Sequence, residues 1–209
     1  AHKKRITPEE LDNLASLGDP QISPDGTQVL YVNKCVQKGV SHSTIWLASS
    51  KGKTAPRELT TNGKDSLARW SPDGKHVAFA RGSEEGSQIY TIDMMGGEPV
   101  QLTKFPEGTI ASIEWSPSGN SLAVSFRKTD ENFTHAAAEV RKATKASDPP
   151  MITEEPWYRL DGDGYFGHAR FHLHLVDAIT GSHRPIWKKD NMGFFSFAWS
   201  PKEDKIALT

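Results

Sequence analysis

One phrase recurs four times along the chain and constrains its fold more than any other feature. The copies are PQISPDGTQVLYV at 20–32, ARWSPDGKHVAFA at 68–80, IEWSPSGNSLAVS at 113–125 and FAWSPKEDKIALT at 197–209. Their Ser-Pro serines stand at positions 23, 71, 116 and 200, so the first two intervals are 48 and 45 residues and the third is 84. Repeats of about 40–50 residues are typical of the four-stranded blades of a β-propeller.

Within each copy, the residue types predict two strands joined by a tight turn. Pro72 presets φ for the first turn position, Asp73 can hydrogen-bond to the nearby backbone, and Gly74 can take the left-handed conformation that closes a hairpin. Apolar and polar residues then alternate over 76–80, which is the period of a half-buried strand. A second hairpin pattern follows, as in SQIYTIDMMGGEPVQLT at 87–103. Each unit is therefore predicted to contain four strands.

These units predict an all-β fold, a partial β-propeller of four-stranded blades with about three and a half blades present. We place blades at 20–61, 67–104 and 110–190, and the first hairpin of a fourth blade at 194–209. A closed propeller typically has four to eight blades, so we expect this chain to be a piece of a longer protein. An open arc leaves strand edges unpaired, which predicts self-association through those edges.

The aromatic residue before Ser-Pro is expected to be a core residue that packs between neighbouring blades. It is a tryptophan in three of the copies, namely Trp70, Trp115 and Trp199. Large aromatic side chains bury much area and dominate such contacts.

The start of the chain predicts a short helix before the first blade, within residues 1–19. Thr7 and Glu10 are placed as the two partners of a capping box, with Pro8 at the first helical position and Gly18 as the stop.

The third blade is predicted to carry an insertion at 128–170, between its first and second hairpins, which explains the long third interval. The segment 134–147 has helix formers and no Gly or Pro, and Asp148-Pro-Pro is expected to end a short helix there. A long structured loop on a repeat scaffold is where function tends to lie.

Composition and charge exclude several classes of partner. Lys and Arg number 25 against 26 Asp and Glu, so nothing predicts binding to nucleic acid or to an anionic membrane. No apolar run approaches the roughly 20 residues that a membrane span needs. The start AHKKRITPEE lacks the apolar region of a signal peptide. The single cysteine, Cys35, excludes an intramolecular disulfide and favours the cytoplasm, with the periplasm as the alternative.

The sequence contains no pattern for a catalytic nucleophile, so no catalytic residue and no cofactor are predicted. A Gly-x-Ser-x-Gly nucleophile elbow does not occur, and no Gly-rich phosphate loop follows a predicted strand.

Two patterns resemble metal sites, but we predict no metal. His172 and His174 would share one face of a strand, and the DGDG stretch at 161–164 resembles the start of a calcium loop without its later ligands. Ordinary strand histidines and a tight turn explain these patterns better. Asn132-Phe133-Thr134 has the form of a glycosylation sequon, which matters only in a secreted eukaryotic protein.

Three stretches together resemble the prolyl oligopeptidase family of serine peptidases. SPDGKHVAFARGSEEGSQIYTIDMMGGEPVQLT at 71–103 is similar to the propeller repeat that this family shares with the Tol-system periplasmic propeller protein. ITPEELDNLASLGDPQISPDGTQVLYV at 6–32 and YRLDGDGYFGHARFHLHLVDAITG at 158–181 resemble the acylaminoacyl-peptidase and dipeptidyl-peptidase-like branch. The resemblance covers about residues 7–209.

This resemblance implies a two-domain parent protein in which the propeller is followed by an α/β-hydrolase domain with the Ser, Asp and His triad. The propeller of that family caps the active site, admits short or unstructured peptides, and can supply groups that hold the N-terminus of a substrate. The implied partners are therefore the hydrolase domain and peptide substrates. No triad residue has a counterpart here, so this chain alone is not expected to hydrolyse peptides.

The candidate substrate-binding residues lie in the insertion and are Tyr158, Arg159, Asp161 and Asp163. A carboxylate there could pair with the ammonium of a peptide, and Arg159 could bind a carboxylate or carbonyl. Alternatively, Arg159 and Asp161 pair with each other or cap turns.

Two other functions stay open on the sequence. One is a non-catalytic, Tol-system-like propeller that serves as a protein-binding platform. The other is a propeller polysaccharide lyase or a different propeller enzyme with its chemistry inside the channel. The 158–177 segment favours the peptidase interpretation, because a plain scaffold propeller does not need it.

Overall fold

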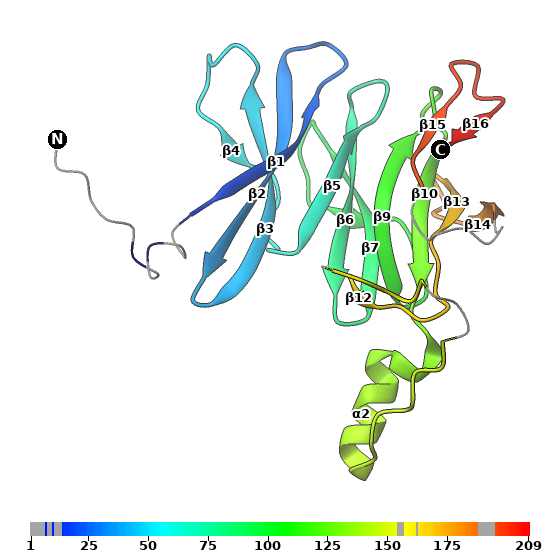
Figure 1. Cartoon of the computed structure of the whole chain (residues 1–209). Helices are drawn as coiled ribbons and strands as arrows, with labels where there is room; N and C mark the ends of the chain where they lie inside the picture. Colours follow the sequence, from blue (N-terminus) through cyan, green and yellow to red (C-terminus); the bar gives the residue numbers. More distant parts are fainter. Residues whose placement is uncertain (1–6, 8–9, 11–13, 154–156, 162, 188–194) are drawn as a thin grey trace. The chain divides into compact units, whose positions relative to one another are not determined.

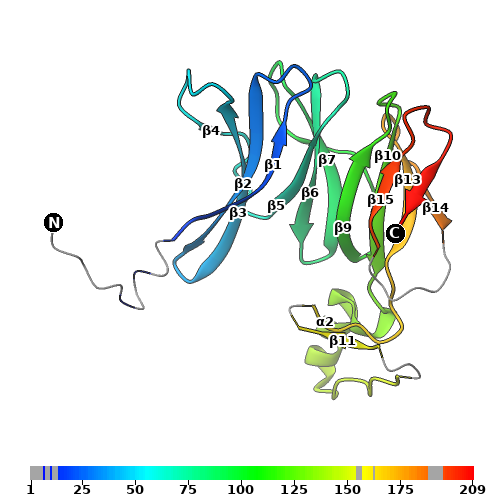
Figure 2. The same cartoon turned by 45° about the horizontal axis from the view of Figure 1, so that its top comes forward.

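A computed structural model describes residues 7, 10, 14–153, 157–161, 163–187 and 195–209, and most of its regular structure consists of antiparallel sheets (Figures 1 and 2). The chain divides into two compact units, residues 1–81 with 89–101 and residues 82–88 with 102–209. No helix among the described residues is long and apolar enough to cross a membrane. The predicted all-β fold of four-stranded blades is confirmed.

The first blade is a four-stranded sheet in the order β1-β2-β3-β4. Its strands are β1 (Ser16–Ile22), β2 (Gln28–Gln37), β3 (Val40–Ser49) and β4 (Arg57–Glu58). The long β2–β3 hairpin pairs in register from Gln28 with Ser49 to Gln37 with Val40. Consecutive strands are therefore neighbours, as two successive hairpins predict.

The second blade repeats this order as β5-β6-β7-β8. Its strands are β5 (Asp65–Trp70), β6 (His76–Ser83), β7 (Gly86–Asp93) and β8 (Val100–Gln101). In the first unit, side chains of the first two blades form one buried cluster. Its members are Leu30, Ile45, Leu47, Ala68, Val77, Phe79 and Ile92.

The third blade contains the predicted insertion and has the order β14-β13-β10-β9. Its strands are β9 (Gly108–Trp115), β10 (Ser121–Lys128), β13 (His172–Asp177) and β14 (His183–Trp187). β10 and β13 pair directly, with Phe126 opposite His172, although the insertion separates them in the sequence. The insertion therefore leaves the sheet at the end of β10 and returns without disturbing the pairing.

A two-stranded sheet follows, made of β15 (Phe197–Trp199) and β16 (Ile206–Leu208). It corresponds to the predicted first hairpin of a fourth blade. Phe197 is buried in a cluster with Ala123 and Leu173 of the third blade.

The insertion comprises η1 (Glu131–Phe133), α2 (His135–Thr144), and the hairpin of β11 (Arg159–Leu160) with β12 (Gly164–Tyr165). α2 is the helix expected at 134–147. It ends earlier than Asp148-Pro-Pro, because Lys145 takes the left-handed conformation (φ 54°) and the Ala146 N–H donates to the Arg141 carbonyl at 3.0 Å.

The predicted lead-in helix lies mostly outside the described residues. The Thr7 N–H donates to the Glu10 carboxylate at 3.3 Å, which is one half of the expected capping box. Gly18 does not stop a helix, because it lies inside β1 and pairs with Val32.

Two of the three tryptophans, Trp70 and Trp199, join neighbouring blades, as the sequence predicts. The Trp70 Nε1–H donates to the Gln21 carbonyl of the preceding blade at 3.2 Å, and the Trp199 Nε1–H donates to the Glu114 carbonyl at 3.4 Å. Each bond ties the first strand of one blade to the first strand of the blade before it.

Candidate functional site

The predicted site residues belong to the β11–β12 hairpin and its entry, in the second unit. Arg159 pairs with Tyr165 and Leu160 pairs with Gly164. Gly164 has φ of 77°, a conformation that favours glycine, and the Asp163 N–H donates to the Leu160 carbonyl at 3.2 Å. Asp161, Asp163 and Gly164 of the DGDG stretch therefore contribute to a hairpin turn, and Gly162 lies outside the described residues.

Asp163 forms a bidentate ion pair with Arg127 of β10. Two guanidinium nitrogens of Arg127 donate to its carboxylate oxygens at 2.7 and 2.6 Å, and the two side chains are 13% (Arg127) and 24% (Asp163) exposed. Hydrogen bonds from Arg127 lower the pKa of Asp163 below its ordinary value, and burial opposes them. Asp163 is therefore ionised at neutral pH and its charge is matched within the protein.

Aromatic rings hold Arg127 in place. Its guanidinium carbon lies 4.5 Å from the centre of the Phe171 ring and 5.6 Å from that of Phe166. Such contacts favour a cation over an aromatic face. Arg127 thus fixes the hairpin to the end of β10.

The other three predicted residues are exposed. The guanidinium of Arg159 lies 5.0 Å from the centre of the Tyr165 ring, and Tyr158 stacks on that ring at 6.1 Å. Asp161 lies in the turn of the hairpin. The structure therefore groups Tyr158 and Arg159 around Tyr165, whereas Asp163 belongs to the support of the hairpin.

Sequence reasoning missed a second supporting residue, Arg170. This side chain is buried and donates to the carbonyls of Gly167 at 2.7 Å and Trp157 at 2.8 Å. It also lies 5.2 Å from the centre of the Phe166 ring. In the sequence, Arg170 stands directly before Phe171 and the strand that follows. An arginine in this position is common and predicts no particular hydrogen-bond partner.

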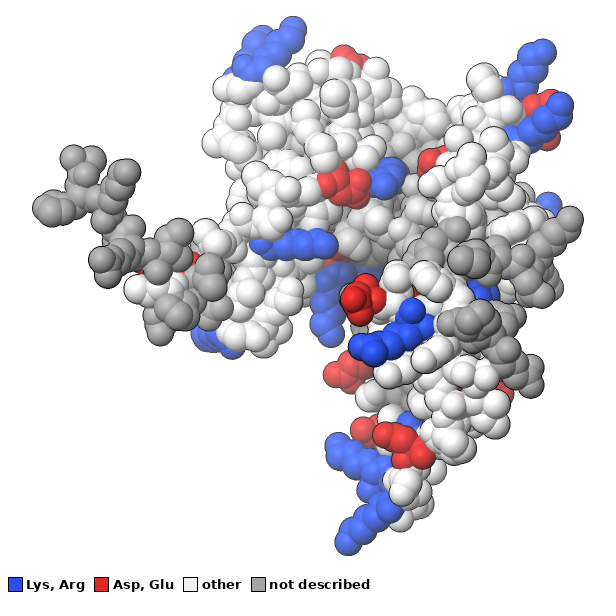
Figure 3. All heavy atoms as spheres, in the orientation of Figure 1, with Lys and Arg blue, Asp and Glu red and all other residues white. Residues whose placement is uncertain are grey.

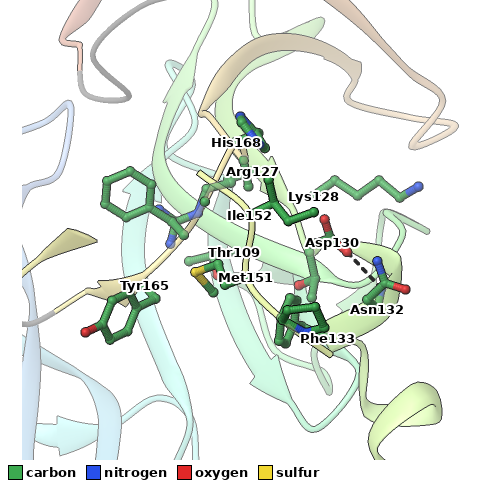
Figure 4. A pocket seen from close by; sticks show the side chains of 15 residues that line it. Thr109, Arg127, Lys128, Asp130, Asn132, Phe133, Met151, Ile152, Tyr165 and His168 are labelled. Atoms are coloured by element: carbon green, nitrogen blue, oxygen red, sulfur yellow. Dashed lines mark hydrogen bonds between the residues drawn. The ribbon is translucent and has the colours of Figure 1, made fainter. Parts of the chain in front are cut away.

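The insertion and the end of the third blade line an open cavity of about 510 Å³ (Figure 4). β9 and β10 contribute Thr109, Arg127 and Lys128, and the segment around η1 contributes residues 129–130 and 132–133. Residues 150–152 and 165–169 complete the lining. Figures 1 and 2 show the insertion beyond the C-terminal end of β10, where these segments meet.

Large apolar side chains lie around this cavity without being buried. Ile152 is 71% exposed, Tyr165 59%, Met151 38% and Phe133 37%. Figure 4 shows Tyr165, Met151 and Phe133 along one part of the lining and His168 at another. The arrangement offers an apolar surface to a ligand.

Polar groups at the cavity are held by local bonds. The Asp130 carboxylate accepts the Asn132 N–H at 2.8 Å and caps η1, and the Lys128 ammonium lies 2.9 Å from a Glu131 oxygen. Asn132 lines the cavity as well, a role that its sequon pattern did not predict.

The N-terminus of α2 is already occupied by protein groups. The Thr134 hydroxyl accepts the Ala137 N–H at 3.2 Å, and both oxygens of the Glu107 carboxylate lie 2.9 Å from the His135 N–H donor. A carboxylate at this end suits the helix dipole, so α2 is anchored there and offers no free anion site.

Metal ligation finds no support in the described part of the chain, where no group of three His, Cys, Asp or Glu residues could hold an ion. His174 packs edge-on against Phe126, with ring centres 5.6 Å apart. On the face shown in Figure 3, basic and acidic side chains are interspersed.

Comparisons with known proteins agree with this architecture, although no family model matches the chain. It is 32% identical over 190 residues to the uncharacterized peptidase YuxL of Bacillus subtilis, an alignment that covers 88% of this chain and 28% of YuxL. The Pyrococcus horikoshii acylaminoacyl peptidase structure matches with a TM-score of 0.69 at 20% identity, over 95% of this chain and 28% of that one. TolB of Acinetobacter baumannii matches with a TM-score of 0.55 at 18% identity, over 92% of this chain and 37% of TolB.

The two structural matches show the fold, which is that of a partial β-propeller with an insertion in its third blade. The sequence relatives, two of which are named as peptidases, support the resemblance of this chain to the propeller portion of the prolyl oligopeptidase family. The chain spans about 28% of the length of YuxL.

Proposed function

We propose that this chain is the substrate-gating propeller of a serine peptidase that cleaves short peptides. The observation that carries the proposal is the 190-residue likeness to a protein named as a peptidase, of which this chain matches 28%. The chain contains no nucleophile elbow, and the family resemblance implies that the proposed catalytic α/β-hydrolase domain follows the propeller in the same protein.

The proposed role of the propeller is to select peptides before they reach the catalytic domain. The insertion supports this role, because it adds an exposed hairpin and a cavity of about 510 Å³ to a blade that is already complete without it. Tyr158, Arg159 and Asp161 are exposed on that hairpin and are our candidates for peptide contacts. Asp163 is proposed to act indirectly, by holding the hairpin through Arg127.

Two further proposals concern the setting of the protein. The single free cysteine, Cys35, supports a cytoplasmic location, with the periplasm as the alternative. β16 belongs to a two-stranded sheet and supports self-association through an open edge, unless further strands of the same protein cover it.

A fluorophosphonate probe tests the peptidase proposal, because it reacts with activated serines. We expect the full-length protein to be labelled and the 209-residue chain to stay unlabelled. Labelling of the 209-residue chain would show that its nucleophile is not in a separate domain. A full-length protein that stays unlabelled and cleaves no short peptide would refute the peptidase function.

The fold match to TolB favours a second candidate, a propeller that serves as a protein-binding platform. The two candidates differ in the sequence downstream of residue 209. A nucleophile elbow followed by Asp and His supports the peptidase, whereas further blades alone support the platform.

A further inference from the structure

We propose that the cavity of the insertion is a binding site for peptides, which takes one large apolar side chain together with the adjoining peptide backbone. This inference rests on the proposed function and adds to it a class of substrate, namely peptides with an aromatic or branched aliphatic residue.

The first argument is the convergence of exposed apolar side chains on one cavity. Phe133 belongs to η1, Met151 and Ile152 to the loop after α2, and Tyr165 to β12. A soluble protein that gathers such side chains from separate segments around one hollow usually does so at an interaction site. Met and aromatic side chains also adapt to apolar groups of different shapes.

The second argument is charge. Arg127 lines the cavity, but its guanidinium is paired with Asp163 in two hydrogen bonds. Lys128 also lines it and is bonded to Glu131. With both cations matched by neighbouring carboxylates, the lining suits an uncharged group better than an anion.

The third argument selects a peptide over a hydrocarbon ligand. Asp130 and Asn132 both line the cavity, and Figure 4 shows the hydrogen bond that the backbone N–H of Asn132 donates to the Asp130 carboxylate, which leaves the side-chain amide of Asn132 out of this bond. The carboxylate of Asp130 is an acceptor, and the amide of Asn132 offers both a donor and an acceptor. A peptide backbone presents N–H and C=O groups that can bond to these side chains, whereas an aliphatic chain offers them no hydrogen-bonding group.

The volume agrees with this occupant. Small-ligand sites are typically about 300–1,000 Å³, and this cavity has about 510 Å³. It can hold one large side chain and its neighbouring peptide groups, so we expect selection at one position of the peptide.

Calorimetric titration of the 209-residue chain tests the site directly. The probes are acetylated and amidated pentapeptides of alanine with Phe, Ala or Asp at the centre, so that terminal charges play no part. We expect the Phe peptide to bind at least about tenfold more tightly than the Ala peptide, the ratio that burial of a large apolar side chain typically gives, and the Asp peptide not to bind.

Ile152→Asp is the main variant, and Ile179→Asp is its matched control. Both isoleucines are exposed, at 71% and 87%, but Ile152 lines the cavity and Ile179 lies in the turn between β13 and β14. We expect Ile152→Asp to weaken binding of the Phe peptide by about tenfold or more and Ile179→Asp to leave it unchanged. Equal melting temperatures of the two variants would show that folding is not the cause.

Three outcomes would overturn the inference. These are equal affinities for the Phe and Ala peptides, equal effects of the two variants, and displacement of the Phe peptide by a medium-chain fatty acid that binds more tightly. None of them bears on the peptidase proposal, which fails only if the full-length protein lacks an activated serine and peptide cleavage.

Discussion

At the scale of single residues, the repeated serine explains why one phrase occurs four times. Ser71 is 3% exposed, and its hydroxyl donates to Asp73 at 2.6 Å while it accepts the His76 N–H at 2.9 Å. Ser23 makes the same two bonds, with Asp25 and with the Gln28 N–H. Hydrogen bonds from these serines are the largest cause of the lowered pKa of Asp25 and of Asp73. Each turn is thus closed by its own side chains.

The hydrogen bond from Trp70 to Gln21, which joins the first two blades, gives a prediction at this scale. Trp70→Phe removes the donor to the Gln21 carbonyl, and we expect it to lower the free energy of unfolding by about 1–2 kcal/mol in urea titrations, because one part-buried hydrogen bond and some packing are lost. Trp46→Phe is the matched control. The Nε1–H of Trp46 donates to Thr44 of the same strand at 3.0 Å. The loss of this bond breaks no contact between blades, so Trp46→Phe should lower the free energy of unfolding by less than Trp70→Phe does. An equal cost for both variants would contradict this role for Trp70.

At the scale of elements, the insertion is stabilised by a few specific bonds and has little core of its own. α2 has ten residues, and none of them is buried. Short isolated helices are marginal in water, so the bonds that Thr134 and Glu107 make to its first turn are needed to hold it. The β11–β12 hairpin depends in the same way on Arg127 and Arg170.

The Arg127–Asp163 pair predicts a pH-dependent contribution to stability. We expect Asp163→Asn to lower the free energy of unfolding by about 1–2 kcal/mol at pH 7, since it weakens two charge-assisted hydrogen bonds. The pKa of Asp163 is lower in the folded chain than its ordinary value of 3.8. The stabilisation is therefore complete above that value and is lost as the pH falls through the lower, folded pKa.

Urea titrations at pH 7 and at successively lower pH measure this effect, and the gap between wild type and Asp163→Asn should narrow as the pH falls below the ordinary pKa of 3.8. Asp161→Asn is the control, because Asp161 is exposed in the same turn. If the difference in the free energy of unfolding between wild type and Asp163→Asn stays constant with pH, the loss of the carboxylate charge is not the cause of the destabilisation.

At the scale of the whole molecule, the two compact units are built from blades of unequal completeness. In the second unit, β10 is paired on both sides, with β9 and with β13. β16 pairs with β15 in a two-stranded sheet. Two-stranded sheets are marginally stable by themselves, so the last hairpin depends on its contacts with the third blade, which include Phe197 and Trp199.

Hydrogen exchange tests this difference in stability. We expect the amides of β16 to exchange at least about tenfold faster than those of β10, because local opening frees a short edge hairpin more easily than a central strand. Exchange is followed at two protein concentrations. Protection of β16 equal to that of β10 at both concentrations would contradict the expectation, and protection that appears at the higher concentration would support self-association.

The sequence by itself determined the repeat, the turns and the place of the insertion. These features depend on interactions between residues close in the chain, such as Ser71 with Asp73 and His76, and on the period-two alternation of the strands. The number of blades and the helix of the insertion follow from such local patterns. The exact end of that helix does not, because it depends on the backbone conformation of Lys145.

The tertiary structure alone decided what the candidate site is made of. Arg127 and Asp163 are 36 positions apart, and Glu107 and His135 are 28 positions apart. Spacing in the sequence says nothing of such pairs. Glu107 and His135 come together because β9 pairs with β10, with Gly108 opposite Lys128, whereas Arg127 meets Asp163 because β10 pairs with β13 and the insertion folds back between them. The sequence predicted Tyr158 and Arg159 as candidate site residues, and both are exposed at the β11–β12 hairpin. The cavity beside it exists because folding leaves an open space between segments that share no local pattern.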